Sequence, residues 1–459
     1  MKLMNQVLFT VLAFTCFSTA QAANEIRMKT DCVSKSEMQT IAQHFTQFAS
    51  YANADYCYDG SQVSNLIASI MFMRGTTFSA MAPSKDELFS GKFAASWWDY
   101  FIGRIDQMQI VNECPKGVIA YVKMFAGKTM FVCPMALTDQ FSSLDRSSVF
   151  MHEARHIDGF PHITCSKGPR VGIQGACDNK ISDTGSYAVT VETYAQLAKF
   201  AIGLHPALRA YARESAVIYA DEAFETPARI SRAEYLLLVS SALDFHALNV
   251  KTNALAKIGH APVAGHIVRR SQHMIMIPND KTLRGSYLFT RNEGEIAQSP
   301  SDLIAEYNSQ TPAEKANLVD LHIGAQWTAK ITKNAIRLAC DPRSPATTDL
   351  PLPAGQTAAN LVYPQGYDRA ATTVQLVTES GDILDVSCTN KTASLSPSAV
   401  KLDQRYKRMY KADGQVFGLT ATGQLFKFDG TRSTPLVTPL DGNIIEIVPQ
   451  QFFEFYETR

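Results

Sequence analysis

The sequence predicts an α+β protein with two parts, a mixed helical and stranded part over about residues 23–260 and a β-rich part over about residues 261–459. Two observations support this division. In the first part, apolar residues recur mainly at three- and four-residue spacing, which is typical of amphipathic helices. Beyond about residue 260, short apolar runs alternate with turn sequences, which indicates strands and hairpins.

The first 22 residues have the pattern of an export signal. Met1-Lys2 gives a positive start, Val7–Phe14 is apolar, and Ala20-Gln21-Ala22 fits a small-x-small cleavage site. This apolar run is too short to span a bilayer, and no later segment is long and apolar enough to do so. We therefore expect an exported chain that begins near Ala23, is periplasmic or extracellular, and has no integral membrane segment after signal removal.

Eight cysteines remain when Cys16, which lies in the predicted signal, is set aside. An even number of cysteines in an exported chain indicates disulfides, although eight cysteines allow 105 pairings. We expect neighbours in the sequence to pair, which joins Cys32 with Cys57, Cys114 with Cys133, Cys165 with Cys177 and Cys340 with Cys388.

Composition and charge exclude several classes of protein. The 46% hydrophobic and 10% aromatic content can fill real cores, so wholesale disorder is excluded. The 43 Lys and Arg residues balance 43 Asp and Glu residues. A chain without net charge or a long basic run is not expected to bind nucleic acid or a membrane surface through charge.

In the first part, helices are expected in three stretches, at about residues 40–111, 146–157 and 186–248. Asp145 is the predicted N-cap of the second helix. Before it, Val118–Val122 and Thr129–Cys133 are short β-rich runs, and the turn at Ala126-Gly127-Lys128 predicts that they form a hairpin.

Three segments of the second part resemble one another, at residues 287–296, 374–383 and 417–425. Each has an apolar strand, a Thr, turn residues, a Gly, a polar residue and a second apolar strand. The turn glycines, Gly294, Gly381 and Gly423, are 87 and 42 residues apart, and a repeat of about 40–50 residues is the length of a β-propeller blade. Residues 331–336 would be a degraded unit between them. Hairpins of any β fold use such turns, and a helical pattern at 303–321 interrupts the repeat, so a propeller-like fold and a generic β-domain both remain open.

The strongest chemical signal is the run His152-Glu153-Ala154-Arg155-His156-Ile157-Asp158-Gly159-Phe160-Pro161-His162. Two His residues four apart project from one face of a helix, which suits two imidazoles on one tetrahedral metal ion. Glu153 can hold the metal-bound water and accept its proton. Gly159 lets the chain leave the helix and turn back, which brings His162 round as a third ligand and leaves a fourth position for water, as in catalytic zinc sites.

A glutamate and two tyrosines from a later predicted helix are further candidates for the same site. Glu192 is an alternative third ligand from a later helix, but His162 completes the pattern without it, so we expect Glu192 to be a solvated carboxylate. Tyr187 and Tyr194 could donate hydrogen bonds to an oxyanion, although burial in a helical core is the commoner role for such residues.

The eleven-residue run resembles the signature of the metzincin clan of zinc metallopeptidases, H-E-x-x-H-x-x-G-x-x-H. The resemblance covers these residues and the strand–helix context of residues 118–156. It implies a zincin-like catalytic domain at 23–260 and one catalytic Zn²⁺ held by His152, His156 and His162, with Glu153 as general base. It also implies a cleft with an edge strand, for which Thr129–Cys133 is the candidate. Metzincins carry a methionine turn beneath the zinc, and here no Met lies between His162 and Met274.

The expected function is that of an exported zinc metallopeptidase that hydrolyses a protein or peptide substrate with zinc-activated water, Glu153 being the base. The β-rich domain, at 261–459, would bind a surface or the substrate. Two alternatives remain: a secreted binding protein with a structural or inactive zinc site, and a zinc amidase that acts on cell-wall material.

Overall fold

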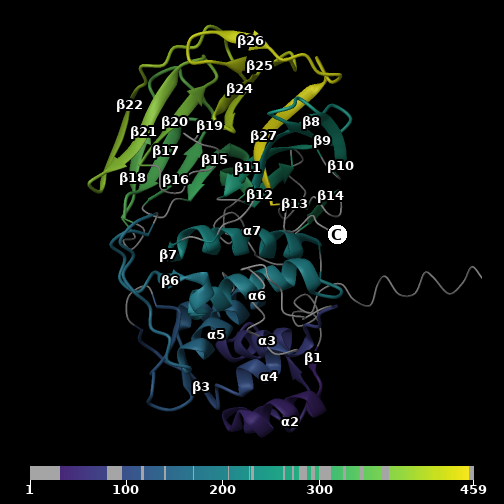
Figure 1. The fold of residues 1–459 in the computed structure, drawn as a ribbon, viewed down its shortest axis with the longest axis vertical. Coiled ribbons are helices and arrows are strands. Elements are labelled where there is room, and N and C mark those ends of the chain that lie inside the picture. Colours follow the sequence, from purple (N-terminus) through teal and green to yellow (C-terminus); the bar gives the residue numbers. More distant parts are fainter. Residues whose placement is uncertain are drawn as a thin grey trace, which may run out of the picture.

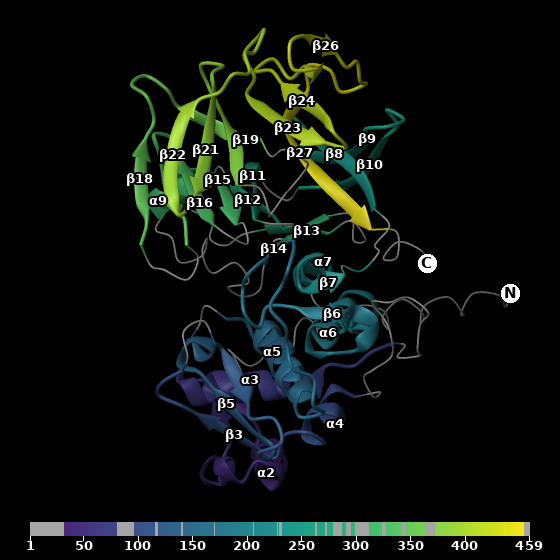
Figure 2. The ribbon, with the colours of Figure 1, turned by 60° about the vertical axis from the view of Figure 1, so that its left-hand side comes forward.

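The computed structural model describes residues 32–79, 96–114, 118–138, 141–168, 170–204, 206–226, 228, 232–261, 264–270, 273–278, 287–290, 295–298, 312–323, 327–341, 346–362 and 372–453. The predicted signal at residues 1–22 lies outside these residues. Helices gather in the first half of the chain and sheets in the second (Figures 1 and 2), which confirms the α+β class. Among the described residues, no helix has both the length and the apolar character needed to cross a membrane.

The first half is built from six α-helices among the described residues. These are α2 (Lys35–His44), α3 (Gln62–Gly75), α4 (Trp97–Ile102), α5 (Ser143–His156), α6 (Ser186–Phe200) and α7 (Pro206–Glu222). The 3-10 helices η1 (Thr46–Tyr51), η3 (Pro134–Leu137) and η4 (Ile181–Asp183) lie between them. Helices α3, α5 and α6 share one core with the other elements of this half, so the site described below rests on a packed scaffold.

Three small sheets complete the first half. Strand β1 (Cys32–Val33) pairs with β2 (Tyr56–Cys57), and β6 (Asp178–Lys180) pairs in parallel with β7 (Phe224–Thr226). The third sheet has the order β3-β5-β4, from β3 (Gln107–Ile110), β5 (Thr129–Val132) and β4 (Ala120–Val122). Strands β4 and β5 are antiparallel, so the predicted hairpin is confirmed.

The second half holds one sheet of eight strands, in the order β11-β12-β13-β14-β10-β9-β8-β27. In chain order these strands are β8 (Arg232–Ser240), β9 (Asp244–Asn249), β10 (Leu255–His260), β11 (Gly265–Arg270), β12 (His273–Pro278), β13 (Tyr287–Thr290), β14 (Glu295–Gln298) and β27 (Ile444–Phe453). The last strand, β27, pairs antiparallel with β8, so the end of the described chain closes onto the start of this half.

Three antiparallel sheets of four strands follow one another between β14 and β27, preceded by the short helix α9 (Pro312–Asn317). The first has β15 (Leu318–Ile323), β16 (Thr328–Thr332), β17 (Ala335–Ala339) and β18 (Thr348–Pro351). The second has β19 (Ala358–Val362), β20 (Thr373–Thr378), β21 (Ile383–Thr389) and β22 (Thr392–Pro397). The third has β23 (Arg408–Ala412), β24 (Gln415–Leu419), β25 (Leu425–Phe428) and β26 (Ser433–Pro435).

Five strands of this half make contacts in cyclic order. Strand β11 contacts β15, β15 contacts β19, β19 contacts β23, β23 contacts β27, and β27 contacts β11. None of the sheets formed by the described strands is closed into a barrel. Each four-stranded sheet therefore places its first strand beside the first strand of the next sheet.

The predicted repeat segments coincide in part with equivalent strands of these sheets. The segments at 374–383 and 417–425 are the hairpins β20–β21 and β24–β25, each the second and third strands of a sheet. The proposed degraded unit at 331–336 is the equivalent hairpin, β16–β17. The segment at 287–296 instead spans β13 and β14, which are not equivalent in position, so the spacing of 87 residues does not measure two repeats.

The expected helix at 186–248 is wrong in its last third. Helix α7 ends at Glu222, and strands β7, β8 and β9 follow. The run from Leu236 to Val239 alternates between two cores: Leu236 and Leu238 enter one, while Leu237 and Val239 enter another. A strand buried on both faces has a continuous apolar sequence, which periodicity cannot distinguish from a buried helix.

Two other helix predictions change in the same way. The stretch at 40–111 contains three α-helices but also η1, β2 and β3. The stretch at 303–321 is helical only at α9 and is a strand from Leu318 on, while residues 303–311 lie outside the described residues.

A division of the chain at residue 260 would cut the eight-stranded sheet between β10 and β11. Strand pairing therefore favours a division between Thr226 and Arg232.

All four predicted disulfides are present, Cys32–Cys57, Cys114–Cys133, Cys165–Cys177 and Cys340–Cys388. Three lie in the first half, and the fourth joins β21 to the residue that follows β17. Such a set of disulfides is typical of chains that mature in an oxidising compartment.

The contact between β27 and β8 can be tested at Ile447, which is fully buried and faces Leu238 across the two strands. Replacing Ile447 by Ala deletes buried methyl groups and leaves a cavity, so we expect the free energy of unfolding to fall by about 2–5 kcal/mol. Val437, which is 81% exposed, is the matched control, and Val437→Ala should change it by less than about 0.5 kcal/mol. The free energies of unfolding are measured by urea titration. An equal decrease in the two variants would contradict this strand pairing.

Candidate metal centre

Helix α5 carries the first two histidines of the predicted site. It begins after Ser142, whose hydroxyl accepts a hydrogen bond from the Asp145 amide at 3.0 Å. The predicted cap, Asp145, instead lies in the first turn, where its carboxylate accepts hydrogen bonds from the hydroxyls of Tyr194 and Tyr211. The start of the helix is thereby fixed to α6 and α7, which sets the positions of His152 and His156, about two and three turns further on.

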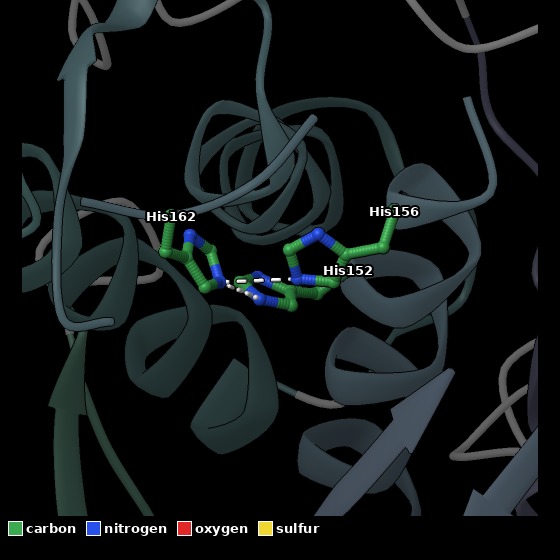
Figure 3. Close-up of side chains that lie close together, drawn as sticks. All are labelled: His152, His156 and His162. Atoms are coloured by element: carbon green, nitrogen blue, oxygen red, sulfur yellow. Dashed lines mark hydrogen bonds between the residues drawn. The ribbon is translucent and has the colours of Figure 1, made fainter. Parts of the chain in front are cut away.

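Gly159 returns the chain toward α5. Its φ angle is +88°, a conformation that residues with a side chain rarely adopt. The chain therefore reverses after the helix end, as the sequence predicts. His162 then faces His152 and His156 from the opposite side (Figure 3).

The three imidazoles meet through the same ring atom. The Nε2 atom of His162 lies 2.9 Å from Nε2 of His152 and 3.1 Å from Nε2 of His156. Two nitrogens that bind one zinc ion at 2.0–2.1 Å in tetrahedral geometry would be about 3.3 Å apart. The observed spacing is close to that value, and these three residues form the group of ligands that could hold a metal ion.

The other ring nitrogen, Nδ1, has a fixed partner in each imidazole. His156 Nδ1 lies 2.5 Å from the carbonyl oxygen of Phe160, and His162 Nδ1 lies 2.8 Å from Oδ1 of Asp178. A carbonyl and a carboxylate can only accept, so both Nδ1 atoms must carry the proton. Neutral imidazoles in this tautomer have a lone pair on Nε2.

His152 has the same tautomer for a less direct reason. Its Nδ1 lies 2.9 Å from the hydroxyl oxygen of Thr190. That hydroxyl donates its proton to the carbonyl of Ser186, at 3.3 Å, and so it accepts from His152. Three Nε2 lone pairs consequently point at one another.

His152 and His156 stay neutral near pH 7. Burial lowers the pKa of His156 to about 4, and the neighbouring His162 lowers it further. Burial also holds the pKa of His152 well below its usual value, with smaller contributions from His156 and His162. Nε2 lone pairs that point at one another repel unless a cation lies between them. The three histidines therefore fit a bound metal ion.

Glu153 lies next to the first ligand and lines the same cavity as His152 and His162. Burial raises its pKa to about 8, while a hydrogen bond from the Val122 backbone acts in the opposite direction. A cation at the imidazoles would lower this pKa again, because an opposite charge favours the carboxylate. Glu153 is therefore placed to exchange a proton near neutral pH.

The cavity beside the imidazoles has a volume of about 270 Å³. It is lined by Val118, Ile119, Ala120, Ser148, Val149, His152, Glu153, His162, Arg170, Gly175, Tyr187, Thr190, Tyr194 and Tyr219. Part of this lining, Arg170 and Gly175, comes from the loop closed by the Cys165–Cys177 disulfide.

The predicted edge strand is wrong. Thr129–Val132 forms β5, which is the middle strand and pairs with β3 on one side and β4 on the other. Strand β4 is the edge of the described sheet next to the cavity, and Ala120 lies in both. The sequence could not separate the two strands of the hairpin, because the third strand, β3, pairs with β5 from about twenty residues earlier.

Glu192 does not belong to the histidine group. It is 2% exposed and accepts a hydrogen bond from Gln196 at 3.1 Å. The expectation of a solvated carboxylate is also wrong, because nearly the whole surface of α6 is buried. The chain thus offers His162 rather than Glu192 as the third ligand.

The two tyrosines differ in their relation to the site. The ring of Tyr187 packs against His162 and His152, with centroids 4.5 and 4.9 Å away, and its hydroxyl donates to the Gly175 carbonyl at 3.4 Å. Tyr194 donates to Asp145 at 2.7 Å. Both hydroxyls have partners within the protein, which supports a packing role.

Asp178 and Thr190 hold the imidazoles, and sequence reasoning missed both. Asp178 also accepts a hydrogen bond from the Tyr187 amide at 2.8 Å, so its carboxylate ties His162 to the start of α6. One signal could have found Asp178: Ile163 and Cys177 form an antiparallel bridge beside the Cys165–Cys177 disulfide. His162 and Asp178 are the next residues on the two sides of that bridge.

No protein-family model matches the sequence, and no curated protein matches it. A structural genomics protein of unknown function from Bacteroides thetaiotaomicron is 8% identical, with a TM-score of 0.23, and the match covers 45% of this chain and 51% of that one. Apo AztD from Citrobacter koseri is 13% identical, with a TM-score of 0.20, over 44% of this chain and 55% of that one. The matches span about half of each solved chain, and such TM-scores carry no conclusion on fold or function.

The role of Asp178 gives a direct test of the centre. Asp178→Asn removes the carboxylate charge that orients His162, so we expect the affinity for zinc to fall about 10- to 100-fold. Competition with a chromophoric chelator measures this affinity without any need for enzyme activity. Asp183→Asn, at an exposed carboxylate paired with Lys180, is the matched control. An unchanged affinity in Asp178→Asn would contradict the placement of His162 as a ligand.

Proposed function

We propose that the protein is an exported zinc-dependent metallopeptidase of metzincin-like type. The observation that carries the proposal is the convergence of His152, His156 and His162, two of which, His152 and His162, line one cavity with Glu153 beside the edge strand β4. Three protein ligands leave a position open, which is the arrangement of catalytic zinc sites, whereas structural sites are closed by a fourth protein ligand. Nitrogen ligands of this kind suit zinc among the metals of exported hydrolases.

The residues of the chain have separate roles in the proposed reaction. His152, His156 and His162 would hold the zinc ion, which would supply Lewis acidity at the scissile carbonyl and at the attacking water. Glu153 accepts the proton of the attacking water and delivers it to the nitrogen of the leaving amine. The neighbouring edge of β4 offers backbone groups to an extended peptide, which would be bound as an added strand.

The outer partners of the imidazoles keep this site ready. Asp178, Thr190 and the Phe160 carbonyl accept the Nδ1 protons, so no ring has to rotate or change tautomer before a metal binds. Packing of Tyr187 against two of the rings limits the access of water from that side.

For the architecture, we propose a zincin-like catalytic domain that ends before β8 and a propeller-like domain from β8 to β27. The cyclic contacts of β11, β15, β19, β23 and β27, together with the pairing of β27 with β8, support five blades. Such a domain would bind a surface or the peptide substrate. Export is supported by the four disulfides, which form in oxidising compartments.

The test is hydrolysis by Glu153→Gln beside the wild type. The amide cannot accept the proton, so we expect zinc content to persist while peptide cleavage falls about 10²- to 10⁴-fold. Zinc is measured by plasma emission, and cleavage with a mixture of labelled peptides and with casein. Glu113→Gln, at an exposed glutamate outside the cavity, should cleave like the wild type.

The outcomes separate the proposed peptidase from its alternatives. Zinc in both proteins without cleavage of any peptide would contradict the peptidase and favour a binding protein with an inactive site. If the wild type but not Glu153→Gln releases fragments from cell-wall material, and neither cleaves peptides or casein, the result would favour an amidase.

A further inference from the structure

Arg170 is the only cationic side chain that lines the cavity in the described part of the chain. It lies in the loop that the Cys165–Cys177 disulfide closes, and it lines the cavity together with His152 and His162. Its side chain is 16% exposed. A guanidinium is always charged near neutral pH, so the cavity holds a fixed positive charge next to the proposed reaction centre.

The guanidinium is held by aromatic rings. Its carbon lies 5.4 Å from the ring centroid of Tyr187 and 5.3 Å from that of Tyr219. These two rings are stacked on each other with centroids 6.2 Å apart. Cation–π contacts with two packed rings fix the direction of the guanidinium before any ligand arrives.

Most of the donors of Arg170 are not used by the protein. A guanidinium has five N–H groups, and within the described residues only Nη1 makes a hydrogen bond, to the Ala176 carbonyl at 3.3 Å. The Nε atom lies 3.7 Å from Oε2 of Glu222, which is an ion pair but too long for a hydrogen bond. Glu222 offsets part of the charge and leaves the donors available.

A second polar group in the cavity lacks a partner. The hydroxyl of Ser148, on α5 one turn before His152, is 1% exposed and makes no hydrogen bond to any described residue. A buried hydroxyl without a partner is costly. In this place it can bind a polar atom of a ligand that fills the cavity.

We propose that Arg170 binds a carboxylate of the substrate, so that the enzyme acts at peptide bonds next to a carboxylate. The inference rests on the proposed function and names its substrate class. Planar guanidinium donors match a carboxylate with two parallel hydrogen bonds, and the adjacent Tyr rings and Ser148 complete a small pocket. The carboxylate is either the side chain of an Asp or Glu residue or the free C-terminus of a peptide, and the two share this chemistry.

The first experiment measures binding rather than turnover. The purified full-length mature chain is loaded with Co²⁺, whose visible spectrum reports ligands at the metal. It is titrated with acetohydroxamate and with the hydroxamate of succinic acid, which carries an added carboxylate. We expect the carboxylate to improve binding about 10- to 100-fold, since charge-assisted hydrogen bonds have this strength.

Variants then assign the preference to Arg170. In Arg170→Gln the ratio of the two dissociation constants should approach 1. In Glu222→Gln the ratio should rise, because the competing carboxylate is removed. Arg74→Gln is the matched control, because Arg74 also lies over an aromatic ring, Trp98, at 5.4 Å but does not line the cavity; its ratio should equal that of the wild type.

The outcomes distinguish this inference from the proposed function. Equal binding of the two hydroxamates by the wild-type protein overturns the carboxylate site while leaving the metal centre intact. A preference that persists in Arg170→Gln also overturns it. No cobalt spectrum, or none that hydroxamates change, overturns the proposed function and this inference with it.

Peptide substrates identify the source of the carboxylate. Faster cleavage of a Glu peptide than of its Gln counterpart assigns the site to a side chain. Faster cleavage of a free acid than of its C-terminal amide assigns it to the chain end. Cleavage that depends on neither overturns the inference.

Discussion

The site depends on one constraint, which is that each of three imidazoles gives its Nδ1 proton to a fixed acceptor and turns its Nε2 lone pair inward. The acceptors come from different places: the Phe160 carbonyl follows the turn at Gly159, Asp178 lies in β6, and Thr190 lies in α6. Each belongs to a packed element or a tight turn. The core of the first half therefore serves to hold Nε2 of His162 about 3 Å from Nε2 of each of the other two imidazoles, a spacing that is repulsive by itself and favourable around a cation.

Helix α7 links this centre to the β-rich half. Tyr219 of α7 lines the cavity, and Glu222 at its end pairs with Arg170. Earlier in the same helix, Glu214 accepts a hydrogen bond from Gln450 of β27 at 3.3 Å, and α7 also contacts β13 and β14 (Figure 2). Strand β27, which closes the β-rich half, thus contacts α7, the helix that borders the cavity. This helix is the direct structural link between the cavity and the β-rich half.

The sequence predicted what short-range patterns encode. The spacing of His152, His156 and His162 placed all three together, because a helical turn and a glycine reversal are local features. The disulfides followed from nearest neighbours, and the hairpins from their turns. It does not predict features set by long-range packing. The apolar run at β8 has the pattern of a helix because both of its faces are buried, and the sequence does not reveal that β5 is a middle strand because its partner β3 lies earlier in the chain. No local pattern marks Arg170, and Asp178 is brought near His162 only through the neighbouring Cys165–Cys177 disulfide, not through a motif.

The central claim is that one metal ion is bound by the Nε2 atoms of His152, His156 and His162. X-ray absorption at the zinc edge of the zinc-loaded protein measures the ligands directly. The account predicts about three imidazole nitrogens at 2.0–2.1 Å, a remaining light-atom ligand and no sulfur. A site with thiolate ligands, with fewer than two imidazoles, or a protein that retains no zinc would contradict it.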